Sequence, residues 1–292
     1  MIINNKTSSF GSLLLGAMFA WVCAVTQTQA APGGAVLDKA VALYTLDFAD
    51  SGAVQGASQI KDSSGNGHHA SAVSSPSEMT WIRVPATGPT SPQGTPSVGP
   101  KARGLDFAPL GDGGTLHPVF TVASGFPLSS PQSIVSRIRF DGPLEGSQQA
   151  WIFNKSNAQD GRGYLFGIRE VGKDFVLAVY TTAKNSTKSA SKLILTPGAW
   201  YDIAVVWDDH GTEDASDDTL SFYLGGKDGI QSQTFSRITL PTDLENGFLR
   251  VGAESADPKV LKAFDGAIDY VALFDSALSS DEIKSLFTRS LH

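Results

Sequence analysis

The sequence has almost no cysteine. Cys23 is the single cysteine in 292 residues, so the chain can form neither an internal disulfide nor a Cys-x-x-Cys redox site. A chain of this length can bury enough apolar surface to fold without disulfides. Long apolar runs are also missing, since no stretch after residue 30 approaches the roughly 20 residues of a membrane-spanning helix. These absences exclude a disulfide scaffold and a membrane span in the folded part.

Positive charge is scarce as well. The chain has 22 Lys and Arg against 29 Asp and Glu, a formal net charge of −7, and the basic residues are scattered. Nucleic acid and anionic membranes are bound by clustered basic side chains. The charge balance therefore argues against both as partners, whereas cations and neutral ligands such as glycans stay open.

The first thirty residues have the pattern of a secretory signal peptide. Lys6 precedes the apolar stretch GSLLLGAMFAWVCAV, and TQTQA supplies small residues before a cut near Ala30. We therefore expect a signal peptide over 1–30, export to the periplasm or the extracellular space, and a single folded domain over 31–292. An exported chain without cysteine is more typical of bacteria than of animal extracellular modules.

From residue 41 on, short segments rich in Val, Ile, Phe and Tyr alternate with Gly, Asn, Asp and Pro. Such segments include VALYTLDF, SIVSRIRF, GYLFGI, DFVLAVY, YDIAVVW, TLSFYL and GAIDYVALF. In YDIAVVW, Ile203, Val205 and Trp207 share one face of a strand. Strands at this spacing, without helices between them, predict an all-β fold, a two-sheet antiparallel jelly-roll sandwich. The proline-rich residues 84–102 are predicted to be a long loop within the domain.

One short C-terminal helix is predicted from SSDEIKSLF. Ser279 and Glu282 have the spacing of a capping box, in which each side chain bonds a free backbone amide of the first turn. Ile283, Leu286 and Phe287 then form one apolar face, so we expect the helix to pack on the sandwich.

Several motifs in a fixed order resemble one family. They are LYTLDFADSG, IKDSSGNGHHA, GLDF, WYDIAVVWDD, TLSFYLGG and FDGAIDYVALFDSALSSDEIKSLF. The set is similar to the LamG-like jelly-roll modules of the concanavalin A-like lectin/glucanase superfamily, from about Val41 to Phe287. The resemblance implies a two-sheet antiparallel jelly roll, often with one structural calcium, in modules that are commonly carbohydrate-binding or adhesive.

The bend KDSSGNG concentrates oxygen-bearing side chains. Asp62 and Asn66 offer hard oxygen ligands, and Asp47 on the preceding strand could come close. The resemblance implies that the strand carrying Asp269 runs beside the N-terminal strand and brings its carboxylate here, where a cation would offset the cost of burying it. The predicted calcium ligands are Asp47, Asp62, Asn66 and Asp269. The alternative is an ordinary turn in which Asp62 caps its own loop, and the local sequence alone favours it.

No pattern in the sequence indicates catalysis. Glucanases of this superfamily place two glutamates four residues apart, and no two glutamates of the chain have that spacing. The motifs G-x-S-x-G and H-E-x-x-H are also absent. We therefore expect a non-catalytic module, and no catalytic residue is predicted.

The main functional hypothesis is an exported carbohydrate-binding or adhesion module with a structural calcium, whose partner is a glycan or polysaccharide. Aromatic rings stack on sugar C–H faces, so Trp81 and Tyr164 are candidate ligand-binding residues, with burial in the core as the alternative for each. Two other hypotheses stay open: a glycoside hydrolase or polysaccharide lyase of the same fold, and a surface component that binds a cell-surface protein.

Overall fold

The computed structural model describes most of the predicted domain. The described residues are 32–46, 59–72, 81–83, 103–107, 119–122, 132–142, 144, 148–157, 162–181, 188–214, 216–238, 248–253 and 262–288. Residues 31–292 form one compact unit. The predicted signal peptide lies outside the described residues, so cleavage near Ala30 stays a prediction. Within the described part, neither helix has the length and apolar character that crossing a membrane requires.

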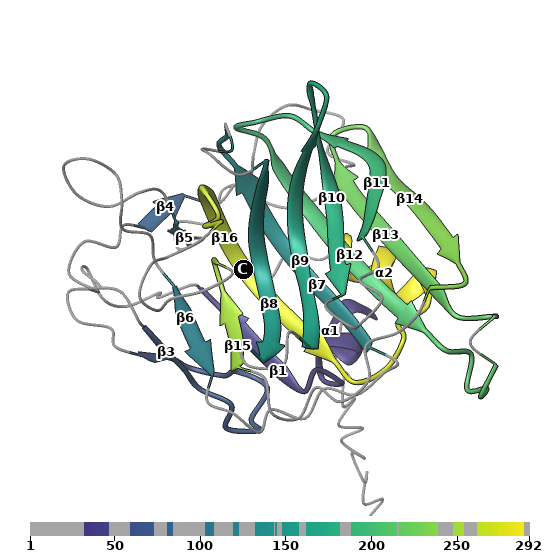
Figure 1. The fold of residues 1–292 in the computed structure, drawn as a ribbon. Coiled ribbons are helices and arrows are strands. Elements are labelled where there is room, and N and C mark those ends of the chain that lie inside the picture. Colours follow the sequence, from purple (N-terminus) through teal and green to yellow (C-terminus); the bar gives the residue numbers. More distant parts are fainter. Residues whose placement is uncertain are drawn as a thin grey trace, which may run out of the picture. The chain divides into compact units, whose positions relative to one another are not determined.

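Two antiparallel sheets confirm the predicted all-β jelly-roll sandwich (Figure 1). The strands of sheet A are β1 (Ala42–Thr45), β4 (Trp81–Arg83), β5 (Arg103–Asp106), β7 (Gln132–Phe140), β12 (Trp200–Asp208), β13 (Thr219–Gly226), β14 (Gly229–Ser236) and β16 (Gly266–Phe274). Their order is β14-β13-β12-β7-β16-β5-β4, and β1 pairs with β16 beside β5.

Sheet B forms the other layer of the sandwich. Its strands are β2 (Gln59–Ile60), β3 (Ala70–Ala72), β6 (Phe120–Val122), β8 (Gln149–Asn157), β9 (Arg162–Val171), β10 (Asp174–Thr181), β11 (Lys188–Leu195) and β15 (Phe248–Val251). Their order is β11-β10-β9-β8-β15-β6-β3-β2. Residues from both halves of the chain therefore alternate within each sheet, as a jelly roll requires.

The period of two along each strand determines which face is buried between the sheets. On β12, Ile203, Val205 and Trp207 pack in the core between the sheets, as predicted. On β9, Tyr164 does the same, and its ring centroid lies 5.0 Å from that of Trp207 across the sandwich. The two sheets are therefore joined by interleaved aromatic and aliphatic side chains from their inner faces.

The predicted C-terminal helix is α2 (Ser280–Phe287), and its capping box is confirmed. Glu282 donates its backbone N–H to Ser279 Oγ at 3.3 Å, and Ser279 donates its N–H to Glu282 Oε2 at 2.9 Å. Ile283, Leu286 and Phe287 are buried against the outer face of sheet A, as the apolar spacing predicts.

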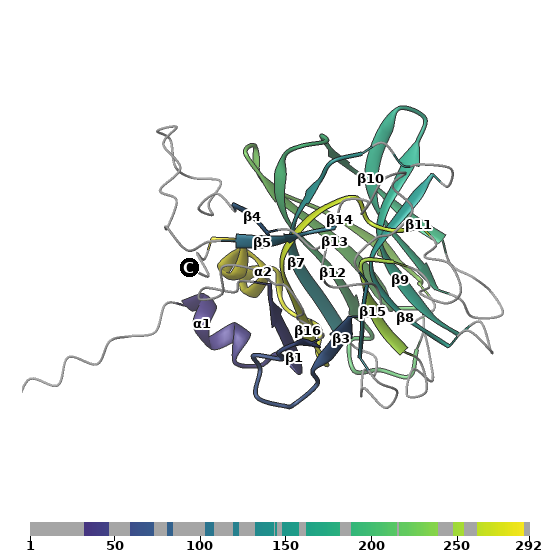
Figure 2. The same ribbon diagram turned by 90° about the vertical axis from the view of Figure 1, so that its left-hand side faces the viewer.

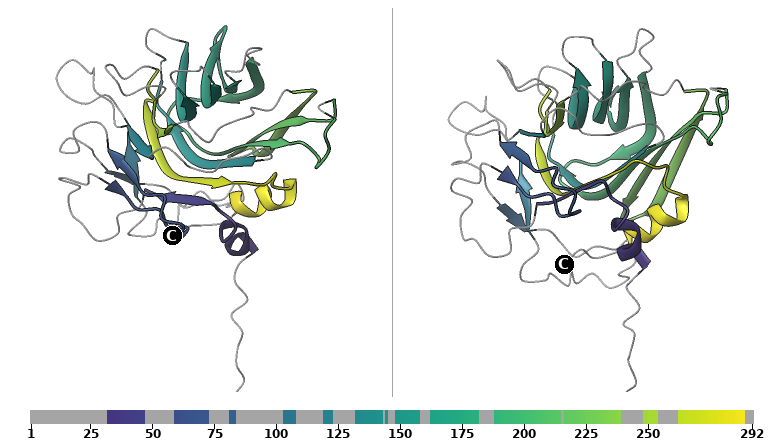
Figure 3. Two further views of the ribbon diagram at one scale, coloured as in Figure 1. Left: turned by 60° about the horizontal axis from the view of Figure 1, so that its bottom comes forward. Right: turned by 90° about the horizontal axis from the view of Figure 1, so that it is seen from below.

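A second short helix, α1 (Pro32–Leu37), also covers sheet A and was not expected from the sequence. Val36 and Leu37 join the cluster that α2 forms on this sheet, and Lys39 Nζ lies 2.6 Å from Glu282 Oε1. Figure 2 shows the resulting layers, with the two helices on one side of sheet A and sheet B on the other. Figure 3 shows β7 and β16 bending toward sheet B. The outer face of sheet B thus receives neither helix.

Candidate functional site

The bend predicted to bind calcium lies against β1. The carboxylate of Asp62 accepts three backbone N–H groups: Oδ1 accepts from Leu43 at 3.0 Å and Ser64 at 2.9 Å, and Oδ2 from His68 at 3.0 Å. Burial raises the pKa of Asp62, but these hydrogen bonds outweigh it and hold the pKa below its usual value. Asp62 therefore caps its own bend and one edge of β1, as the turn alternative describes.

Asn66 serves the same edge through its amide nitrogen. Its Nδ2 donates to the carbonyl of Val41 at 3.1 Å and to that of Ala40 at 3.4 Å. Gly65 and Gly67 have φ angles of 91° and 82°, a region that favours glycine. The polar composition of the bend is thus explained by backbone groups that would otherwise lack partners.

Calcium binding stays a prediction. Asp47 lies outside the described residues, and among the described ones no three His, Cys, Asp or Glu side chains form a group suited to a metal ion. A carboxylate has about four lone-pair sites, so the three amides on Asp62 leave about one for an ion. Any calcium at the bend would need its other oxygens from elsewhere.

Asp269 contacts an arginine on the outer face of sheet A. It lies at a β-bulge of β16 opposite β7, is 2% exposed, and its Oδ2 is 3.9 Å from Arg137 Nε. Arg137 Nη1 also donates to Asp202 Oδ2 at 3.2 Å. The guanidinium carbon of Arg137 lies 5.8 Å from the centroid of the Trp200 ring. The positive charge that compensates the buried carboxylate therefore comes from Arg137.

Asp202 is the second carboxylate of this triad. Burial raises its pKa to about 7, Arg137 opposes the rise, and Asp269 adds to it. The site lies near α2, because Gly225, the cross-strand partner of Asp202, leaves room for the ring of Phe287. Two carboxylates that share one guanidinium cannot both ionise easily, so the triad tends to keep one proton. Both are buried, so this pair does not face a substrate groove.

The two aromatic residues predicted to bind a glycan do not form a common surface. Tyr164 is fully buried, its ring stacked 5.6 Å from that of Phe153, so its proposed contact with a surface ligand is wrong and the core alternative holds. Trp81 begins β4, and its side chain lies outside the described residues.

A different group of residues shares the outer face of sheet B. Gln149 and Trp151 from β8 meet Tyr180 from β10: the two rings lie edge to face at 5.0 Å, and Gln149 Nε2 donates to Tyr180 Oη at 2.6 Å. The Trp151 ring crosses β9 over Gly167, where a Cβ atom would lie 2.9 Å from the ring. We call the sheet B outer face the side chains of Thr121, Gln149, Trp151, Arg169, Tyr180 and Arg250.

Arg169 on this face differs from the arginines of sheet A. It is the cross-strand partner of Gln149 and Val176, and it alternates with the core residues Phe166 and Ile168. Its side chain is half-buried, and its Nε is buried without a hydrogen-bond partner in the described part of the chain. The indole N–H of Trp151 is in the same condition. Two donors on one face are therefore available to a ligand.

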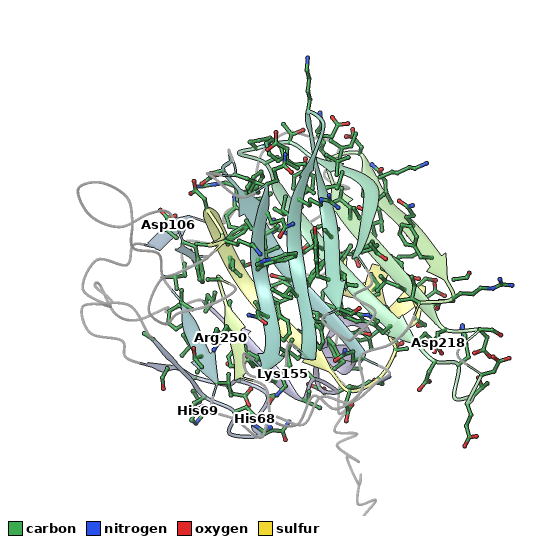
Figure 4. All side chains as sticks on the ribbon, viewed as in Figure 1. His68, His69, Asp106, Lys155, Asp218 and Arg250 are labelled. Atoms are coloured by element: carbon green, nitrogen blue, oxygen red, sulfur yellow. The ribbon has the colours of Figure 1, made fainter. Side chains whose placement is uncertain are left out.

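Farther along the same face, Arg250 on β15 lies between Asn154 on β8 and Thr121 on β6. Burial lowers the pKa of Arg250, but an arginine keeps its charge at neutral pH. Lys155, the next residue on β8, faces the core instead, and burial lowers its pKa to about 8. Figure 4 shows Arg250 and Lys155 on neighbouring strands, away from Asp218 at the β12–β13 hairpin.

Sequence reasoning missed the residues of this face. Trp151 and Tyr180 both fall within segments predicted as strands, and Arg169 follows the strand segment GYLFGI. Alternation shows which residues share a face, but Val176 and Ala178 make the outer face of β10 as apolar as its inner face. Pairing partners such as Gln149 and Tyr180 are 31 positions apart and could be found only from the sheet order.

The fold and the sequence agree on one family. A family model described as the concanavalin A-like lectin/glucanases superfamily matches residues 114–284, more than half of the chain. The chain belongs to this superfamily, as the sequence motifs predicted. None of the curated proteins matches it.

Solved structures show the same fold at low sequence identity. The binding domain of botulinum neurotoxin DC, solved with SialylT, is 11% identical with a TM-score of 0.50, over 86% of this chain and 51% of that one. Domain 4 of an extracellular arabinanase from Geobacillus stearothermophilus, solved with arabinotriose, is 15% identical with a TM-score of 0.48, over 86% and 98%. The heptameric SAP-like pentraxin of Limulus polyphemus is 13% identical with a TM-score of 0.45, over 61% and 78%. At these identities the likeness concerns the fold alone.

Proposed function

We propose that the protein is an exported carbohydrate-binding module that holds a glycan on the sheet B outer face. The observation that carries the proposal is the half-buried ring of Tyr180, which Trp151 and Gln149 fix on a sheet face that no described helix covers. A fixed aromatic ring stacks on sugar C–H groups without losing much conformational entropy on binding.

Polar groups beside the ring suit the same ligand. Sugar hydroxyls need both donors and acceptors, and Gln149, Thr121 and the Trp151 indole stand on this face with Tyr180. Membership of a superfamily of lectins and glucanases supports a glycan as the ligand class. The signal-peptide pattern over 1–30 supports export, and the resemblance of the bend to calcium-carrying modules supports a structural calcium.

The test is glycan binding by the purified protein and two variants of Tyr180. Affinity electrophoresis or calorimetry against a panel of polysaccharides should identify a ligand. Tyr180→Ala should weaken its binding about tenfold or more, equivalent to about 1.4 kcal/mol. Tyr180→Phe should lose less, because the ring remains and only its hydrogen bond with Gln149 is removed.

Tyr223→Ala is the matched control. Tyr223 is also a half-buried tyrosine on an outer sheet face, but it belongs to sheet A and packs beside the helices. Its loss should lower stability and leave affinity unchanged. Equal losses of affinity in Tyr180→Ala and Tyr223→Ala would contradict the proposed site. New reducing or unsaturated sugar ends in the same incubations would replace the binding module by a hydrolase or lyase.

A further inference from the structure

We propose that the glycan is anionic, and that Arg169 on the sheet B outer face binds one of its carboxylates. This inference rests on the proposed function and adds the ligand class. It opposes the expectation from composition, since the whole chain has a net charge of −7. Binding depends on the local charge of a face, and that can differ in sign from the net charge.

The first argument is the environment of Arg169. Within the described part of the chain it has neither a hydrogen bond nor an ion pair, and its Nε is shielded from water. Leaving a buried guanidinium N–H without an acceptor is unfavourable, so the site gains when an acceptor arrives. The arginines of sheet A show the usual solution: Arg137 lies beside Asp202 and Asp269, and Arg139 Nε donates to Asp141 at 2.6 Å.

The second argument is the type of acceptor that fits. A planar guanidinium binds a carboxylate through two parallel N–H···O bonds, which a sugar hydroxyl cannot match. The indole N–H of Trp151 is a second donor without a partner on this face, from a side chain that is 1% exposed. The donors without partners on this face thus call for an acceptor-rich ligand.

The third argument is the charge along the face. Arg250 lies on the other side of β8 from Arg169, opposite Asn154, whereas Arg169 is opposite Gln149. Five residues along a strand span about 15 Å, so the two arginines could contact separate anionic groups of one chain. Among the described strands of this face, Asp174 is the acidic side chain, and it lies at the start of β10. The face is therefore net positive on a negatively charged protein.

The test compares ligands that differ only in charge. Polygalacturonate and its fully methyl-esterified form share one sugar backbone, and chondroitin sulfate and a neutral arabinan extend the comparison to sulfate and to uncharged chains. We expect the wild-type protein to bind polygalacturonate at least about tenfold more tightly than the ester, with affinity falling as salt rises. Chondroitin sulfate, which carries sulfate besides carboxylate, should bind no more tightly than polygalacturonate.

Arg169→Gln should lose that preference and keep its affinity for the ester. Arg139→Gln removes the same charge from sheet A and should leave every affinity unchanged. Equal binding of the two galacturonan forms, tighter binding of the sulfated chain, or full affinity in Arg169→Gln would overturn the inference. If neutral glycans bind and depend on Tyr180 but not on Arg169, only this inference fails. If none of the polysaccharides binds, the proposed function fails with it.

Discussion

The two outer faces of the sandwich each carry an arginine on an inner strand, and the two arginines have opposite surroundings. Arg137 on sheet A is 4% exposed and lies between the carboxylates of Asp202 and Asp269. Arg169 on sheet B is half-buried and contacts no carboxylate among the described residues. The same residue type thus occurs once with its charge matched twice and once with it unmatched.

The difference follows from what covers each face. Two helices lie on sheet A, so a charge there is removed from water and must be compensated within the protein. Neither helix reaches sheet B, where Arg169 keeps part of its solvent contact and its binding capacity. The comparison separates a structural arginine from one available for recognition, and the predictions below test that separation.

The largest expected effect is the loss of Arg137. Arg137→Met keeps most of the apolar stem but leaves Asp202 and Asp269 buried without their counter-charge. We expect the free energy of unfolding to fall by about 3–5 kcal/mol near neutral pH, measured by urea denaturation. The loss should shrink at acidic pH, where protonation removes the negative charges.

Arg169→Met is the matched control on sheet B. It removes a charge of the same sign that has no partner, so stability should change by no more than about 0.5 kcal/mol. Equal losses in the two variants would show that the arginines play the same role and would end the comparison.

The second effect concerns the proton held by Asp202. Its folded-state pKa is raised to about 7, whereas an unfolded aspartate titrates near about 4. Between these values the folded protein keeps a proton that the unfolded chain releases, so this site's contribution to stability falls as pH rises. Asp202→Asn cannot ionise, and relative to wild type it should gain up to about 1.4 kcal/mol per pH unit in that window.

Urea denaturation of both proteins at about pH 5 and about pH 8 measures this gain. Asp141→Asn, which removes a more exposed carboxylate bonded to Arg139, should give no such rise with pH. Parallel curves for wild type and Asp202→Asn would mean that Asp202 is ionised throughout the range and that one guanidinium compensates both carboxylates.

The fold was predictable because its determinants are local and repeated. Alternating residues on β12 and the capping box of α2 follow from neighbours a few positions apart, and both were found from the sequence. Helix α1 was missed, because its six residues, PGGAVL, include two glycines and no acidic first turn. Its stability comes from packing beside α2, which the sequence alone does not show.

The candidate site was less predictable because its contacts join distant strands. Asp269 was expected to need a cation, and the structure supplies one in Arg137, which lies 132 positions away on a neighbouring strand. Similarly, nothing near Arg169 in the sequence shows that a carboxylate is missing. Predicting either case requires the sheet order and the register, which decide where each charge lies.

The smallest effect separates the two interpretations of the bend at 62–67. Asp62→Asn keeps the shape of the side chain but weakens its hydrogen bonds to three backbone amides, so it should cost about 1–2 kcal/mol in calcium and in chelator alike. Calcium at the bend adds a second effect, because an ion that binds only the folded state raises the melting temperature. Chelation should then lower the melting temperature of the wild-type protein, and the variant should lose that response. Unchanged melting on chelation would contradict the calcium prediction and leave the turn as the role of Asp62.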